Sequence, residues 1–213
     1  FVDSYDAIKQ YVMEHYQDAS VIVSNVPELA MGTKIGNETD DGILWPDGKA
    51  SLNMQNFAQL ISAGAEASKT VFPNAKVMVH VSNGWNNSLF RWIFDGLKTN
   101  GVKWDIIGMS LYPTYAPAGW QNANNLCLQN MNDMVSRYNT PVMVVEIGMP
   151  WDNPSEAKLF IEDLINKVKL VNVKNGLGVF YWEPECYNNW QGYSLGAFNN
   201  SGKPTIALDP FLK

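Results

Sequence analysis

Short apolar runs alternate with longer amphipathic segments along most of the chain. Several of the short runs are apolar at consecutive positions, as in Val142-Met143-Val144-Val145. Consecutive apolar positions are typical of parallel strands that are covered on both faces. The predicted strands are Thr33–Asn37, Lys76–Ser82, Asp105–Tyr112, Pro141–Ile147 and Gly176–Trp182.

The segments between these runs carry apolar residues at helical spacing. One of them begins at Asn153, a capping residue, followed by Pro154 at the first helical position. These stripes predict core-facing helices and indicate no function by themselves. The predicted helices are Phe1–Met13, Ser51–Val71, Asn86–Thr99, Asn122–Tyr138 and a segment that starts at Asn153.

The predicted strands end at regular intervals. Glu38, His80, Tyr112, Glu146 and Trp182 are 42, 32, 34 and 36 positions apart. A β/α repeat of this length indicates a (β/α)8 barrel or a doubly wound sheet. No glycine-rich phosphate loop follows any predicted strand, which disfavours a nucleotide-binding sheet. Eight such units need roughly 290 residues, so five strands predict a barrel whose first strands are missing from this chain.

Two glutamates, Glu38 and Glu146, each end a predicted strand. A carboxylate is costly at such a place because burial disfavours its charged form. The carboxyl ends of barrel strands are where catalytic residues gather, and a pair of carboxyl groups is what hydrolysis of a glycosidic bond requires. The alternative is that each glutamate is a buried acid whose hydrogen bonds are made by neighbouring groups. This explanation is reasonable for either residue alone and far weaker for both together.

The amino-acid composition limits the kinds of molecule that the protein is expected to bind. The chain has 213 residues, 46% of them hydrophobic, which is enough for a sizeable core. A net charge of −6 argues against nucleic acid and anionic membranes as partners, and no apolar run reaches bilayer length. Cys127, Cys186 and two histidines form no disulfide framework or metal motif. Eight Trp and nine Tyr residues suit the flat faces of a neutral glycan.

Several segments, in chain order, carry a family resemblance. They are Gly36-Asn37-Glu38 with Gly42-Ile43-Leu44-Trp45-Pro46, Val77-Met78-Val79-His80, Arg91–Asp95 through Trp104–Pro113, Val145-Glu146-Ile147-Gly148 and Tyr181-Trp182-Glu183-Pro184. Together they resemble the endo-β-1,4-galactanases of glycoside hydrolase family 53. The resemblance implies strands four to eight of a (β/α)8 TIM barrel, with strands one to three absent. Residues 1–213 would then be a single, N-terminally truncated catalytic domain.

The resemblance also implies roles for individual residues. Glu38 would be the acid/base and must keep a proton near neutral pH, whereas Glu146 would be the nucleophile of a retaining double displacement. Asn37 would donate a hydrogen bond to the sugar 2-hydroxyl. Tyr112 ends the intervening strand and is well placed to donate to Glu146. The remaining substrate-binding candidates are His80, which would orient the nucleophile or contact sugar, Trp182 as the sugar platform, and Trp45 and Trp85 as cleft-lining residues.

The expected activity is cleavage of β-1,4-galactosidic bonds in galactan or type I arabinogalactan. A mannanase or cellulase of similar architecture, or a non-catalytic glycan-binding protein, remains as an alternative. No cofactor is expected. Some family members hold calcium in the last loops, but Asp152, Asn153, Asn188 and Asn189 lack the spacing of a dedicated calcium loop, so no metal is assigned.

The location implied by a polysaccharide substrate is secreted, periplasmic or on the cell surface. The chain shows no signal peptide, and its first residues already have the pattern of a helix, so we expect a trimmed sequence. Two features depart from the family pattern. Tyr16–Ala30 matches poorly, and Cys186 stands where an aromatic or polar loop residue is expected.

Overall fold

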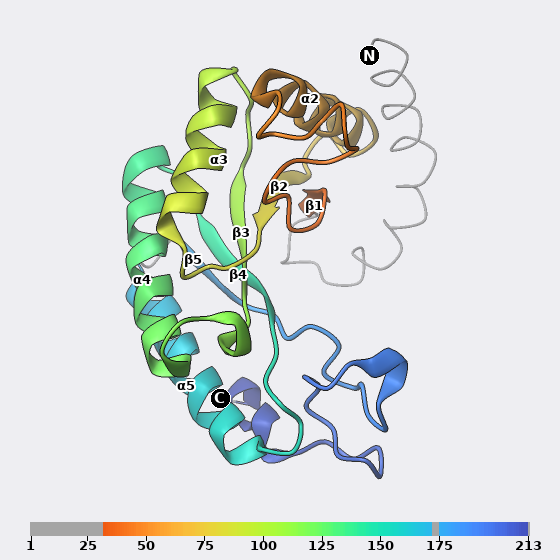
Figure 1. Cartoon of the computed structure of the whole chain (residues 1–213). Helices are drawn as coiled ribbons and strands as arrows, with labels where there is room; N and C mark the ends of the chain where they lie inside the picture. The colour runs from red at the N-terminus through yellow and green to blue at the C-terminus, as the bar shows by residue number, and fades with distance from the viewer. Residues whose placement is uncertain (1–31, 172–174, 213) are drawn as a thin grey trace. The chain divides into compact units, whose positions relative to one another are not determined.

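The computed structural model describes residues 32–171 and 175–212 (Figure 1). The helix predicted at Phe1–Met13 and the atypical stretch Tyr16–Ala30 lie outside the described residues. None of the helices in the described ranges is long and apolar enough to cross a membrane.

The five predicted strands are confirmed. They form one sheet with the strand order β1-β2-β3-β4-β5, which is also their order along the chain. The pairs β1–β2 and β4–β5 are parallel. Sequential parallel strands with helices between them are what a β/α repeat produces. The strands are β1 Gly32–Ile35, β2 Lys76–Val81, β3 Ile106–Leu111, β4 Val142–Ile147 and β5 Gly176–Val179.

The four helices predicted within the described residues are also confirmed. Asn53 caps α2, where its side chain accepts a hydrogen bond from the Asn56 amide at 3.1 Å. Asn153 caps α5 in the same way, with Pro154 at the first helical position as predicted. The helices are α2 Met54–Val71, α3 Asn87–Thr99, α4 Gly119–Tyr138 and α5 Pro154–Leu170 (Figure 1). Three short 3-10 helices follow strands or end the described chain, at Pro113–Tyr115, Trp190–Gly192 and Ile206–Leu212.

The described residues divide into two compact units. The first comprises residues 32–81 and 88–107, and the second comprises 82–87, 108–171 and 175–212. In the first unit, α2 packs directly on β1, because Gly64 lets the helix approach Ile35; a Cβ on Gly64 would lie 2.8 Å from Ile35 Cγ2. Only a residue without a Cβ permits this approach.

Asp105 stabilises the start of β2 within the first unit. Its Oδ2 accepts hydrogen bonds from the Val77 amide at 2.8 Å and from Lys69 Nζ at 3.1 Å. Burial raises the pKa of Asp105, but the Val77 amide and the Lys69 ammonium together outweigh burial and hold this pKa below its usual value. The carboxylate therefore stays ionised and keeps the beginning of β2 in place.

In the second unit, two helices support the sheet through buried asparagines. Asn124 of α4 donates to the Phe160 carbonyl of α5 at 3.1 Å and to Asp163 at 2.8 Å. Asn130 donates to the Gly84 carbonyl at 2.8 Å. These bonds satisfy polar groups that would otherwise cost free energy in the core, so α4 is held both to α5 and to the loop that follows β2.

Two strand ends differ from the prediction by more than one residue. β1 ends at Ile35 rather than Asn37, because Gly36 turns the chain with a φ of +77°. Glu38 therefore lies in a loop and does not close the strand. β5 ends at Val179 rather than Trp182. Its extension still follows β4 irregularly, because the Phe180 amide donates to the Val144 carbonyl and the Trp182 amide to the Ile147 carbonyl.

Candidate active site

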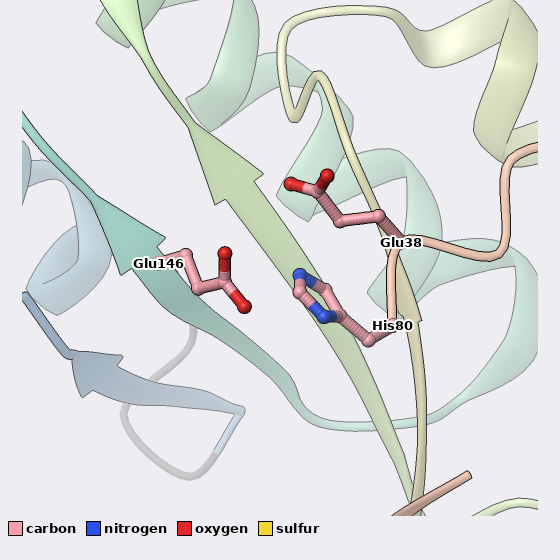
Figure 2. A group of neighbouring side chains, drawn as sticks. All are labelled: Glu38, His80 and Glu146. Carbon is pink, nitrogen blue, oxygen red and sulfur yellow. The ribbon is translucent and has the colours of Figure 1, made fainter. Parts of the chain in front are cut away.

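Glu38 is held beside β2 by the residue that follows it. The Thr39 amide and the Thr39 hydroxyl both donate to the His80 carbonyl, at 2.8 Å and 3.0 Å. Thr39 is fully buried, so these bonds lie away from water. Figure 2 shows Glu38 on the loop after β1 and His80 on β2, with Glu146 on β4 of the second unit. The loop conformation thus decides where the Glu38 carboxylate stands.

The backbone of Glu38 itself is unusual. Its φ is +46°, in the left-handed region that residues with a Cβ rarely adopt. Gly36, two residues before Glu38, has no room for a side chain, since a Cβ there would lie 2.5 Å from Thr39 Cγ2. A non-glycine residue persists in this region only where its surroundings hold it, and such residues cluster at functional sites. The two hydrogen bonds that Thr39 donates hold the Glu38 backbone in this conformation.

His80 is fully buried and uncharged. Burial, with a further contribution from the positive charge of Lys34, lowers the pKa of His80 to about 3. Lys34 also donates to the Asn37 side-chain oxygen, and Asn37 is exposed. Lys34 thus uses the acceptor of the Asn37 side chain, whose other polar group is the amide NH2, a donor.

Glu146 is the buried carboxylate of the second unit. It belongs to β4 and is only 6% exposed. The Tyr112 hydroxyl donates to Glu146 Oε2 at 3.4 Å, which is the contact predicted from the position of Tyr112 after β3. A hydrogen bond to a buried carboxylate favours its charged form, so this contact suits a residue that must stay ionised.

Tyr193 is a residue that the sequence did not single out. Its hydroxyl donates to the Trp182 carbonyl at 3.1 Å, and it lies beside Gly148 together with Tyr112. Gly148 leaves the space for this arrangement, because a Cβ there would lie 2.9 Å from both Tyr112 Cε1 and the Tyr193 oxygen. Tyr193 follows no strand and belongs to no motif, so only the folded loop identifies it.

The predicted aromatic residues stand in different surroundings. Trp182 is 46% exposed, and its backbone is bound to Ile147 on one side and Tyr193 on the other. Trp45 is 59% exposed, and its ring nitrogen donates to the Asp41 carbonyl at 2.9 Å. Both leave an aromatic ring partly exposed, as stacking against a sugar requires, although Lys49 Nζ lies 4.1 Å from the centroid of the Trp45 ring.

Trp85 differs from the other two. It is half-buried, and its ring nitrogen is buried without a hydrogen-bond partner among the described residues. The role of Trp85 in substrate binding stays a prediction.

Comparison with known proteins identifies the family. The model of glycosyl hydrolase family 53 matches residues 2–211. An arabinogalactan endo-β-1,4-galactanase of Humicola insolens is 30% identical over 226 residues, covering 93% of this chain and 64% of the Humicola protein. A protein of Neosartorya fischeri named probable arabinogalactan endo-β-1,4-galactanase A is 34% identical over 177 residues, covering 73% and 49%.

The fold agrees with these relatives. A solved structure described as one of two fungal β-1,4-galactanases superimposes with a TM-score of 0.81 at 26% identity, covering 98% of this chain and 68% of that chain. The predicted fold class is thereby confirmed: the β/α units are those of a (β/α)8 barrel. The chain spans about half to two thirds of the length of the curated relatives described above. With the family model matching nearly its whole length, the chain belongs to glycosyl hydrolase family 53.

Proposed function

We propose that the protein containing this chain is a retaining endo-β-1,4-galactanase acting on galactan or type I arabinogalactan. The observation that carries the proposal is the family match over residues 2–211, which contains both glutamates of the predicted pair. Relatives that bear the name arabinogalactan endo-β-1,4-galactanase support the substrate class. In each unit the glutamate is held by a hydrogen-bonding neighbour rather than by chance packing, through Thr39 in one and Tyr112 in the other.

The proposed chemistry divides between the two carboxyl groups. Glu38 protonates the leaving oxygen while Glu146 attacks the anomeric carbon and forms a galactosyl ester. Water then releases the sugar, with Glu38 acting as the base. A retaining mechanism of this kind needs carboxyl groups roughly 5–5.5 Å apart, whereas an inverting one needs about 6.5–9.5 Å.

Neighbouring residues take supporting roles in this proposal. The exposed Asn37 amide donates to the sugar 2-hydroxyl, a bond that strengthens in the transition state. His80, being neutral, can donate or accept a hydrogen bond without adding positive charge. Trp182 forms the platform at the reaction centre, and Trp45 and Trp85 contact sugar further along the cleft.

Residues 1–213 act, in this proposal, as part of a single catalytic domain that requires no cofactor or metal. Its partner is a neutral polysaccharide rather than nucleic acid, in keeping with a net charge of −6. A polymer of this kind lies outside the cell, so the protein would be secreted, periplasmic or attached to the cell surface.

The decisive experiment compares β-1,4-galactan with β-1,4-mannan and cellulose as substrates of the protein that carries this chain. We expect reducing ends to appear from galactan, with short oligosaccharides whose newly formed anomeric centre is initially β. Release from mannan or cellulose alone would assign the protein to another barrel glycosidase. Galactan binding without any release of reducing ends would indicate a glycan-binding protein instead.

A further inference from the structure

Lys49 lies against one face of the Trp45 ring, in the loop that joins β1 to α2. Its Nζ stands 4.1 Å from the ring centroid, a distance at which the negative face of an indole attracts an ammonium group. Trp45 is nonetheless 59% exposed. Because an indole ring has two faces and the ammonium occupies one of them, a sugar can stack only on the other.

Asp41 holds both members of this pair. Its carbonyl accepts a hydrogen bond from Trp45 Nε1 at 2.9 Å, and its carboxylate lies 3.7 Å from Lys49 Nζ. The carboxylate is itself fixed, because it accepts hydrogen bonds from the Ser51 amide at 2.7 Å and from the Ser51 hydroxyl at 2.9 Å. The edge of the indole and the cation over its face are therefore both bound to one residue, which restricts the orientation of the Trp45 ring.

The backbone around Trp45 folds back on itself. The Ile43 amide donates to the Gly48 carbonyl at 3.1 Å, and Gly42 pairs with Lys49 in an antiparallel bridge. The two segments approach so closely that a Cβ on Gly42, whose φ is +87°, would lie 1.9 Å from the Gly48 oxygen. Trp45 thus lies in the turn of a closed loop, where its backbone as well as its ring is held.

This turn is continuous with the turn that carries Glu38. The Gly42 amide donates to the Thr39 carbonyl at 3.1 Å, and Thr39 in turn donates to the His80 carbonyl of β2. One loop within the first unit therefore sets the position of Trp45 relative to Glu38. A ring that is held in advance loses less rotational freedom when a ligand stacks on it, so its orientation contributes to affinity.

We propose that Lys49 is a positioning residue for substrate binding, which orients the Trp45 ring so that its open face meets a sugar of the galactan chain. The inference rests on the proposed function, in which Trp45 contacts sugar. It adds a residue that acts through the ring from the opposite face and does not touch the sugar. Such an orientation favours the bound substrate and the transition state alike, so its loss should change KM rather than kcat.

The test compares Lys49→Met with Lys49→Arg in the protein that carries this chain, with galactan as substrate. Methionine is unbranched like lysine but uncharged, so the lost cation–π contact should raise KM about 2- to 5-fold with kcat unchanged. Arginine also stacks on aromatic rings, so Lys49→Arg should keep KM within about 1.5-fold of the original. An unchanged KM in Lys49→Met, or a loss confined to kcat, would overturn the inference. A lower KM would also overturn it, since the ammonium would then compete with the sugar for the ring.

Lys76→Met is the matched control. Lys76 forms an ion pair of similar length in the same unit, with Nζ 3.8 Å from Asp105 Oδ1. It is paired with Gly32 at the beginning of β1, whereas the loop that carries Trp45 follows the other end of that strand. Exposed ion pairs contribute little, so kcat and KM should stay within about 1.5-fold of the original. If Lys76→Met raised KM as Lys49→Met does, the loss of any surface charge would explain both.

A double-mutant cycle with Trp45→Ala separates this inference from the proposed function. Trp45→Ala should raise KM for galactan more than Lys49→Met does. In the Trp45→Ala background, Lys49→Met should change KM less than about 1.5-fold, because Lys49 acts only through the ring. Equal effects in both backgrounds would overturn the role of Lys49 alone. An unchanged KM in Trp45→Ala would overturn the contact between Trp45 and sugar, and the inference with it, while the release of reducing ends by the original protein would still support the proposed function.

Discussion

Thr39 donates two hydrogen bonds to the carbonyl of His80, from its amide at 2.8 Å and from its hydroxyl at 3.0 Å. The two residues are 41 positions apart, and the contact joins the loop after β1 to the C-terminal end of β2. Since Thr39 directly follows Glu38, the same contact fixes the proposed acid/base residue in its left-handed backbone conformation. Stability and function of this loop should therefore change together.

Thr39→Val tests this coupling. The substitution keeps the shape of the side chain but removes its hydroxyl from a fully buried position. We expect the free energy of unfolding to fall by about 1 kcal/mol, and kcat to fall as well, because Glu38 loses part of its support. Urea denaturation and initial rates on galactan give the two values. Thr70→Val is the control, since the Thr70 hydroxyl bonds to Glu66 at an exposed helix position and should matter little. A variant of Thr39 with unchanged kcat would show that the hydroxyl does not position Glu38.

Glu146→Ala should abolish hydrolysis and respond to added azide. Without the carboxylate, the small anion can occupy its place and attack the anomeric carbon directly. From a β-galactoside with a good leaving group, the expected product is the α-galactosyl azide, of inverted configuration. Product analysis by NMR checks this. A β-azide from this variant would reverse the roles assigned to the two glutamates.

Glu38→Ala should fail in a different way. It lacks the acid that assists departure of the leaving group, so aryl galactosides with good leaving groups should keep far more glycosylation activity than galactan does. Azide should here yield the β-galactosyl azide, because Glu146 still forms the ester that azide then displaces. Rates across a series of aryl leaving groups measure the effect. Insensitivity to leaving-group quality would remove Glu38 from the acid role.

Acidification should weaken the fold through His80. The pKa of this residue is about 3 in the folded protein and about 6.5 in an unfolded chain, so the unfolded state binds more protons between these values. The contribution of neutral His80 to the free energy of unfolding is complete above pH 6.5. It is lost as the pH falls toward 3, by at most about 1.4 kcal/mol per pH unit. Unfolding free energies of the original protein and of His80→Gln, measured from pH 7 to pH 4, should differ in slope, with the variant less sensitive. Parallel slopes would mean that His80 is not kept neutral by the fold.

Gly148→Ala should disturb the second unit locally. The added methyl group would lie 2.9 Å from Tyr112 Cε1, 2.9 Å from the Tyr193 oxygen and 3.0 Å from Leu195 Cβ. Crowding of this kind in a packed region typically costs about 1–3 kcal/mol. We expect a lower melting temperature and a loss of kcat at temperatures where the variant is still folded. Full activity in a variant of unchanged stability would show that neither tyrosine needs its present position.

The sequence by itself determined the β/α alternation, the helices and the capping of α5 at Asn153 and Pro154. These features depend on hydrophobic period and on cap chemistry, which are properties of neighbouring residues. Its motifs also pointed to family 53 and to Glu38 and Glu146. Each motif is a short run of neighbouring residues, so it can be recognised without knowledge of the fold.

Only the tertiary structure decided how those carboxylates are supported. Periodicity predicted a strand up to Asn37, but the left-handed turn at Gly36 ends β1 two residues earlier and leaves Glu38 to be held by Thr39 and His80. Tyr193 is 81 positions from Tyr112, and nothing local to either residue predicts that both lie beside Gly148. Contacts of this kind depend on the path of loops between strands, since a pattern of nearby residues carries no information on which distant side chains meet.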